Sequence, residues 1–187
     1  MDSNPPRDAT PSAPVTASKG YLAHWRGMRR VLVATDGSLS AADAIGFAVD
    51  FASGRDAELT FVHVVPTVEF VPTAGSDEVR GAVAHEPTAQ EHAALEDAAA
   101  LAAGHGVPAT TVLLSGSTAE EIVAHAESCG ADLIVIGSLG HGPVASALLG
   151  SVALGVLHAS KLPVLVVRCA VSPSSPGSTT DRGGTPA

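Results

Sequence analysis

Aromatic side chains are scarce in this sequence, with four Phe, one Tyr and one Trp among 187 residues. The apolar fraction of 45% is ordinary, so a hydrophobic core has to be built from Ala, Val, Leu and Ile. Such side chains suit strands that pack against alanine-rich helices. The length is that of one domain, and we therefore expect a single domain with an aliphatic core.

Cysteine and long apolar runs are also in short supply. The two cysteines, Cys129 and Cys169, lie far apart and form no disulfide framework, so we expect reduced thiols in the cytoplasm. No run approaches the roughly 18 apolar residues that a membrane span requires. Residues 1–20 lack the apolar stretch of a signal peptide. These absences predict a cytoplasmic protein without a membrane partner.

Positive charge is low, with 10 Lys and Arg against 19 Asp and Glu and a net charge of −9. A broad basic face is therefore excluded, and we expect no nucleic-acid partner. A small anion bound by backbone amides is compatible with this charge. The eight histidines show neither HExxH nor Cys–His spacing, and no G-x-S-x-G elbow occurs. The sequence thus predicts no protein-bound metal and no serine hydrolase.

The composition divides the chain into three parts. We assign residues 1–28 to a disordered N-terminal extension, 29–169 to the folded domain and 170–187 to a disordered C-terminal tail. The two ends are rich in small and polar residues and cannot bury enough apolar surface to offset their ordering entropy. The segment YLAHWRGM (21–28) contains the only Tyr and Trp, and it either packs on the domain or marks a contact site.

Within the domain, short apolar runs alternate with stretches of helical periodicity. We expect helices with capping pairs Ser40–Asp43 and Thr118–Glu121, and a long polar connection after Pro66. Such alternation indicates an open, doubly wound α/β fold with a parallel sheet covered on both faces. In such a fold, ligands bind beyond the carboxyl ends of the strands. The predicted strands are 30–35, 58–66, 109–114, 132–137 and 163–168, and the predicted helices are 38–53, 88–106, 118–130 and 151–161.

Four glycines in GSLGHGPVASALLGS (137–151) fit two nucleotide-binding patterns. Gly140-x-Gly142-x-x-Ala145 matches the dinucleotide fingerprint, but it does not directly follow its strand and no acidic residue lies in 158–167. Only one strand remains after it. A phosphate-binding P-loop also fails, since Val156 and Leu157 occupy the positions of the required Lys and Ser or Thr. We therefore reject both interpretations.

The second pattern is Gly137-x2-Gly140-x9-Gly150-Ser151, and it has a physical rationale. Gly137 ends a strand and, without a side chain, lets a sugar approach the sheet edge. Gly140 removes a Cβ where loop amides would contact phosphate. Gly150 and Ser151 begin the last helix, where free amides and the helix dipole favour an anion, and Ser151 is a good N-cap. The residues between Gly140 and Gly150 form a flap over the polyphosphate.

This glycine spacing, together with VLVATDGS (31–38) and KLPVLVVR (161–168), resembles the universal stress protein family over residues 29–169. The resemblance implies a five-stranded parallel sheet of order 3-2-1-4-5, similar to the adenine nucleotide alpha-hydrolase-like fold. It also places the chain in the branch of the family whose glycine spacing accompanies ATP binding.

The same resemblance implies a set of nucleotide contacts. Asp36 lies near the nucleoside, and the main chain of Val64 meets the adenine edge. Two departures from the family pattern are Ala34, where some members have proline, and Ala153, where a threonine often contacts phosphate. The implied binding residues are Thr35, Asp36, Val64, Gly137, Gly140, Gly150, Ser151 and Val152.

From these residues we expect an ATP-binding stress-response sensor or regulator in the cytoplasm, with any Mg²⁺ carried by the triphosphate. The resemblance further implies a homodimer formed by antiparallel pairing of the last strands through Val164, Leu165, Val166 and Val167. Two alternatives stay open. One is a slow ATPase that uses Asp36 or His141, and the other is a dimeric scaffold that needs no nucleotide.

Two candidate residues also have a structural interpretation. Asp36 could brace the DGS turn or cap the helix that follows it. His63 lies within a predicted strand, and the interpretation that we favour is a core histidine with a satisfied ring nitrogen.

Overall fold

The computed structural model describes residues 27–70, 81–84, 86–140 and 149–168. The predicted disordered ends, residues 1–28 and 170–187, lie outside this range apart from Gly27 and Met28. Residues 141–148 of the predicted flap, with His141, and the thiol of Cys169 also lie outside it. Met28 is buried in the core, so the folded part includes at least one residue before 29.

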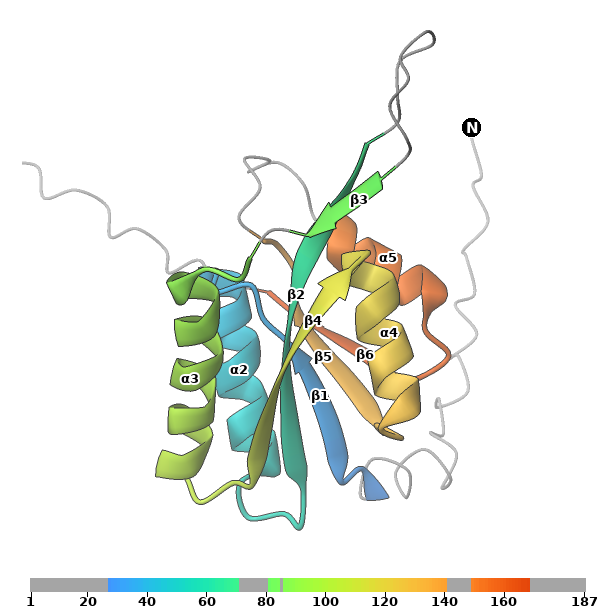
Figure 1. Ribbon diagram of the computed structural model, residues 1–187. Helices are drawn as coiled ribbons and strands as arrows, with labels where there is room; N and C mark the ends of the chain where they lie inside the picture. Colours follow the sequence, from blue (N-terminus) through green and yellow to red (C-terminus); the bar gives the residue numbers. More distant parts are fainter. Residues whose placement is uncertain (1–26, 71–80, 85, 141–148, 169–187) are drawn as a thin grey trace, which may run out of the picture.

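Five parallel strands form the main sheet (Figure 1). Its order is β4-β2-β1-β5-β6, which is 3-2-1-4-5 when these five strands are numbered along the chain. The predicted fold and strand order are confirmed. The order reverses between β1 and β5, where connections leave to opposite sides of the sheet. The strands are β1 (Arg30–Ala34), β2 (Glu58–Phe70), β4 (Ala109–Gly116), β5 (Leu133–Gly137) and β6 (Val164–Val167).

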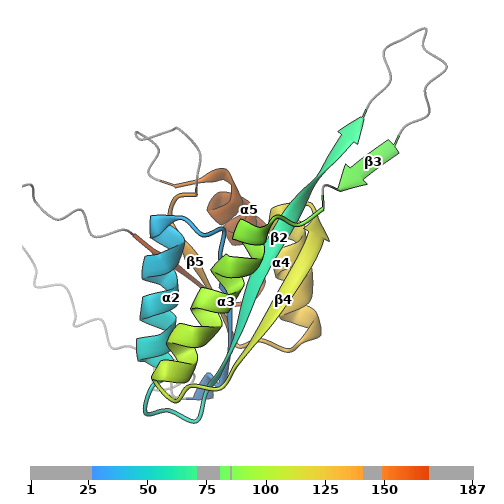
Figure 2. The ribbon, with the colours of Figure 1, turned by 60° about the vertical axis from the view of Figure 1, so that its left-hand side comes forward.

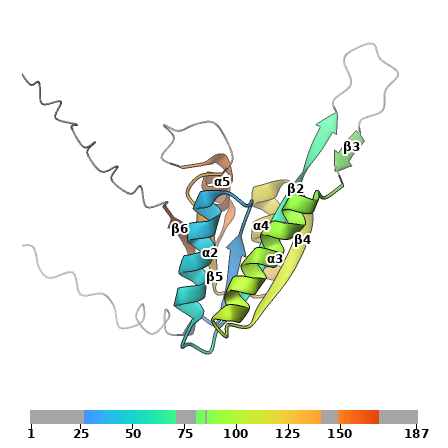
Figure 3. The ribbon, with the colours of Figure 1, turned by 90° about the vertical axis from the view of Figure 1, so that its left-hand side faces the viewer.

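Helices cover both faces of the sheet, as the alternation of strands and helices predicts. Figure 3 shows α2 (Leu39–Ala52) and α3 (Ala89–Gly104) on one face, with α4 (Thr118–Ser128) and α5 (Ser151–Ala159) on the other. Two hydrophobic clusters correspond to these two faces. Each helix follows a strand, so the N-terminal end of each helix lies near the carboxyl edge of the sheet.

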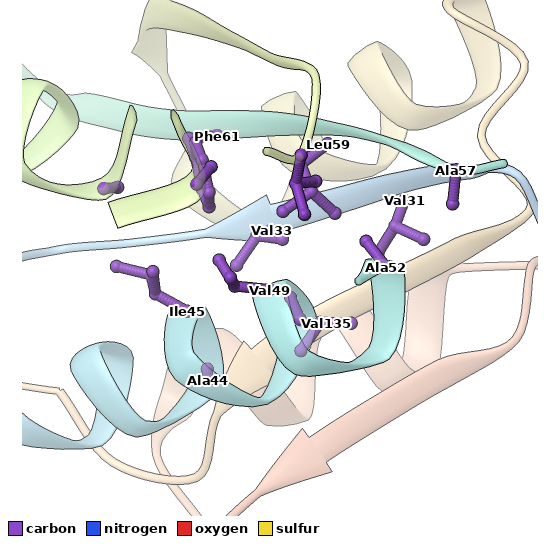
Figure 4. Packing of buried hydrophobic residues seen from close by; sticks show 14 of the residues in the cluster. Val31, Val33, Ala44, Ile45, Val49, Ala52, Ala57, Leu59, Phe61 and Val135 are labelled. Atoms are coloured by element: carbon purple, nitrogen blue, oxygen red, sulfur yellow. The ribbon is translucent and has the colours of Figure 1, made fainter. Parts of the chain in front are cut away.

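β5 is apolar throughout and β1 is apolar after Arg30, because both faces of these strands are buried. Side chains alternate along β1, so Val31 and Val33 pack towards α2 while Leu32 and Ala34 pack towards α4 and α5. Figure 4 shows Val31 and Val33 between the sheet and Val49 of α2. Most of the side chains between the layers are aliphatic, and Phe61 is the one aromatic residue in the buried clusters of the described residues.

The expected end of the second strand at Pro66 is wrong. β2 continues to Phe70 and pairs in antiparallel fashion with a strand that we did not predict, β3 (Gly81–Ala84). Figure 2 shows these two segments extending away from the main sheet. The even-numbered residues of β2 direct their main-chain groups towards β1, which pairs with β2 only as far as Val62. A missing N–H at Pro66 therefore removes no bond to β1, and the strand continues.

Both predicted capping pairs are wrong by a small shift. Ser38 caps α2 and accepts a hydrogen bond from the Ala41 amide, because the helix begins one residue before Ser40. Ser117 is the N-cap of α4 and makes no side-chain cap bond. Ser40 is instead buried, and its Oγ accepts a hydrogen bond from the amide of Leu139 at 3.2 Å. The start of α2 is thereby tied to the loop that follows β5.

Close packing of α4 on α5 explains a glycine inside a helix. A Cβ on Gly155 would lie 2.8 Å from the Cβ of Ala119, well inside van der Waals contact. The helices can approach only because neither residue carries a larger side chain. This contact packs the second turn of α5 against the first turn of α4.

Candidate functional site

A cavity of about 530 Å³ lies at the carboxyl ends of β1 and β5 and between the first turns of α4 and α5. This is the position that a doubly wound sheet predicts for a ligand, and the volume suits a small organic molecule. All eight sequence-predicted binding residues line the cavity. They are Thr35, Asp36, Val64, Gly137, Gly140, Gly150, Ser151 and Val152.

One end of the cavity is apolar. Its walls are formed by side chains of the sheet face that packs on α4 and α5, together with Ile122 of α4. These side chains are Ala34, Val62, Val64 and Ile136, each buried to at least nine-tenths. Flat apolar walls of this kind suit a planar ring system.

The main chain of Val64 is directed towards this end. The Thr35 amide donates to the Val62 carbonyl at 2.9 Å, so the main-chain groups of Val62 and, two residues on, of Val64 point to the β1 side of the strand. β1 has ended at this level, because its pairing with β2 stops at Ala34 opposite Val62. A donor and an acceptor of β2 therefore face the cavity beyond the end of β1.

The turn after β1 has its own hydrogen bonds. Oδ1 of Asp36 accepts from the Ser38 amide at 2.9 Å, and Oγ1 of Thr35 accepts from the Gly37 amide at 3.2 Å. Gly37 has a φ of 79°, which favours glycine. The interpretation that Asp36 braces the DGS turn is thus confirmed. Its contact with a nucleoside stays a prediction.

Position 137 requires glycine because of a close contact that the sequence does not reveal. A Cβ there would lie 2.7 Å from the carbonyl carbon and oxygen of Ser40 in α2. The missing side chain therefore permits α2 to pack on β5, whatever binds in the cavity. At Gly140 the equivalent Cβ would meet only the end of the Asp36 side chain, and at Gly150 it would make ordinary contacts of 3.4 Å or more.

The N-terminal end of α5 forms the polar end of the cavity. Gly150 is the N-cap, so Ser151 is the first helical residue rather than the cap that we expected. The Gly150 amide donates to the Ser138 carbonyl at 2.7 Å, and the Leu154 amide donates to the Gly150 carbonyl at 3.0 Å. The amides of Ser151, Val152 and Ala153 precede this first helical bond and have no acceptor among the described residues.

Sequence reasoning missed part of the wall. Thr118 and Ile122 of α4 line the cavity, as do Ser138 and Leu139 after β5. A signal for Thr118 was present, since it follows the carboxyl end of a strand that neighbours β2. Applying the strand-end rule to every strand, rather than to β1 and β5 alone, would have found it.

Charged side chains contribute little to the part of the cavity that the structure describes. Asp36 is the one charged residue among the described lining residues, which include no Lys or Arg. No group of three His, Cys, Asp or Glu side chains within the described ranges could hold a metal ion. An anion at this site would therefore depend on backbone amides. Within the described ranges, no helix has the length and apolar character needed to cross a membrane.

Comparison with known proteins identifies the family to which this fold and this sequence are similar. The model of the universal stress protein family matches residues 27–168, which is most of the chain. The universal stress protein YxiE of Bacillus subtilis is 38% identical over 149 residues, covering 74% of this chain and 98% of the relative. A universal stress protein of Methanocaldococcus jannaschii is 37% identical over 142 residues, covering 75% of this chain and 82% of the relative.

Solved structures show the same similarity. One is a universal stress protein crystallised in complex with cAMP, which is 28% identical to this chain. It superposes with a TM-score of 0.56 and covers 75% of this chain and 97% of that protein.

Proposed function

The chain belongs to the universal stress protein family, and we propose that it binds adenine nucleotides, with ATP as the preferred ligand. The observation that carries the proposal is the shape of the cavity. An apolar end faces the main chain of Val64, and a polar end faces the amides that begin α5. A nucleotide has the same division between base and phosphate. A solved relative bound to cAMP supports this assignment.

The phosphates would lie at the polar end. Amides of Ser151, Val152 and Ala153 have the free N–H groups and the helix dipole that stabilise an anion. The Ser151 side chain is exposed at the same turn, so its hydroxyl can donate a further hydrogen bond. Because these donors carry no formal charge, the site is compatible with the overall charge of −9.

The base would lie at the apolar end, between the sheet and Ile122. The N–H of Val64 can donate to N1 of adenine, and its carbonyl can accept from the N6 amino group. Guanine presents a donor and an acceptor in the reverse order at these positions. Mismatched polar groups would remain unpaired, so the site should prefer adenine.

The proposal includes a role for the bound nucleotide. We propose that the protein is a cytoplasmic sensor or regulator whose state depends on ATP occupancy, with any Mg²⁺ bound to the triphosphate rather than to protein carboxylates. The slow ATPase is not favoured by any observation. Asp36 already accepts a hydrogen bond from Ser38, and the described lining offers no Lys or Arg to stabilise a transferring phosphoryl group.

Isothermal titration calorimetry with adenosine, AMP, ADP, ATP, cAMP and GTP tests the proposed function. We expect ATP to bind at least about tenfold more tightly than AMP. Each hydrogen bond from a main-chain amide to a charged phosphate contributes about 1.5 to 3 kcal/mol, and ATP offers more phosphate oxygens. GTP should bind at least about tenfold more weakly than ATP. Absence of binding by every adenine compound would favour the nucleotide-independent scaffold. Tighter binding of cAMP than of ATP would refute the polyphosphate assignment.

We also propose that the protein is a homodimer formed through β6. This strand ends the sheet of described strands, and its four residues, Val164, Leu165, Val166 and Val167, are only half-buried. An apolar edge strand exposes unpaired main-chain groups that favour association. Antiparallel pairing of β6 with its counterpart in a second copy would cover that edge.

A further inference from the structure

One buried polar residue lines the cavity but has no part in the proposed binding contacts. His63 lies in β2 and is only 6% exposed. Side chains alternate along this strand: Leu59 and Phe61 pack towards α2 and α3, whereas Val62 and Val64 pack towards α4 and α5. The His63 ring therefore lies on the α3 side of the sheet, on the opposite face from the apolar wall of the cavity.

From that side, His63 contacts the end of β1. Its Nδ1 lies 2.8 Å from the carbonyl oxygen of Thr35. A carbonyl oxygen can only accept a hydrogen bond, so Nδ1 must carry a proton and donate. The prediction of a core histidine with one hydrogen-bonded ring nitrogen is thus confirmed for Nδ1. Thr35 lines the cavity and directly precedes Asp36, so this bond fixes the point where the chain leaves β1 for the site.

The other ring nitrogen faces α3. Nε2 lies 3.4 Å from Oε1 of Glu91, an ion-pair distance, but makes no hydrogen bond with any described residue. The second oxygen of that carboxylate, Oε2, accepts from the amide of Thr88 at 2.7 Å and from its hydroxyl at 2.9 Å. The capping box of α3 thus holds Glu91 beside the ring.

We propose that His63 is a positioning residue for the nucleotide site: it fixes the Thr35 carbonyl from the opposite face of the sheet. The inference rests on the proposed function, because the turn that it positions carries Thr35 and Asp36 into the cavity. Loss of the Nδ1 bond would release this carbonyl and displace the turn relative to Val64.

Two amide substitutions separate the roles of the ring nitrogens. His63→Asn places an amide nitrogen near the position of Nδ1, so it can retain the bond to Thr35 while losing the approach to Glu91. His63→Gln places its amide near Nε2 and loses the Thr35 bond. We expect His63→Asn to bind ATP within about threefold of wild type, and His63→Gln to bind about fivefold to tenfold more weakly, the value of one neutral hydrogen bond.

The control for general loss of stability is Thr88→Ala. It removes the Thr88 hydroxyl, which accepts from the Glu91 amide and donates to Oε2 of Glu91, but keeps the main-chain amide bond to Oε2 and the His63–Thr35 bond. It should lower the melting temperature while ATP affinity changes less than about twofold. Equal weakening of ATP binding by His63→Asn and His63→Gln, or weakening by Thr88→Ala as large as that by His63→Gln, would overturn the positioning role.

Nuclear magnetic resonance of the ligand-free protein distinguishes failure of this inference from failure of the proposed function. The ring ¹⁵N shifts of wild-type His63 should show a protonated Nδ1, and the amide signals of Asp36 and Gly37 should move in His63→Gln but not in His63→Asn. An unprotonated Nδ1, or unchanged amides in both variants, overturns the inference. If the ring ¹⁵N shifts and the amide signals behave as expected but the wild-type protein binds no ATP, only the proposed function is overturned.

Discussion

Ser151→Asp is expected to weaken ATP binding about 30-fold while leaving the fold slightly more stable. Ser151 is the first residue of α5, and its side chain is exposed at the cavity. A carboxylate in the first turn stabilises a helix by about 0.3 to 1 kcal/mol through the helix dipole. The same carboxylate about 5 Å from a phosphate would repel it by roughly 2 kcal/mol at a partly exposed site. Stability and affinity should therefore change in opposite directions.

The matched control is Ser151→Asn, which has nearly the same size as Asp and no charge. We expect it to bind ATP within about threefold of wild type, and Ser151→Asp to bind uncharged adenosine normally. The ATP penalty should shrink in about 1 M salt, because exposed charges are then screened beyond about 3 Å. Calorimetry measures the affinities, and thermal unfolding measures the stability. Equal ATP affinities for the Asp and Asn variants would place the phosphates elsewhere.

Val166→Pro is expected to convert a dimer into a monomer without unfolding the sheet. The Ile134 amide donates to the Pro163 carbonyl, and the Ser138 amide donates to the Val167 carbonyl. Main-chain groups alternate in direction along a strand, so Leu165 also faces β5 and Val166 directs its N–H outward. Proline at 166 removes only that outward donor, and proline is tolerated on an edge strand.

We expect the dimer dissociation constant of Val166→Pro to rise at least about 100-fold. One main-chain N–H donor is lost from each copy, and the carbonyl opposite it on the partner strand loses its hydrogen bond. Val166→Ala is the control, since it trims the same half-buried side chain but keeps the N–H. Sedimentation velocity over a range of concentrations measures the effect. A wild-type protein that is monomeric throughout, or a Val166→Pro variant that dimerises as well as Val166→Ala, would exclude an interface along β6.

The sheet could be predicted because its signal is local and strong. β5, and β1 after Arg30, are continuous apolar runs, as strands buried on both faces must be, and each strand is followed by a helix. β3 could not be predicted in this way. Its segment, GAVA, is only four residues long and contains a single β-branched residue, and the proline at 66 looked like a stop signal. Whether a proline ends a strand depends on where its missing N–H would point, which the sequence does not state.

The predicted binding residues line one cavity, but the reasons for these residue types were only partly visible in the sequence. The glycine spacing pointed to Gly137, Gly140, Gly150 and Ser151, and these four residues line the cavity. The requirement for glycine at 137 comes from Ser40, which is distant in sequence, and no local pattern reveals that contact. Similarly, the Gly150 amide bonds to Ser138, so the free donors belong to the three residues after it.

The central claim is that main-chain amides at the start of α5 bind the phosphates of ATP. Amide-resolved ¹H–¹⁵N spectra of the wild-type protein, titrated in parallel with ATP and with adenosine, test it most directly. Both ligands should move the amide signal of Val64, whereas only ATP should strongly move those of Ser151, Val152 and Ala153. If those three signals stay in place while ATP saturates the protein, the phosphates bind elsewhere and the claim is wrong.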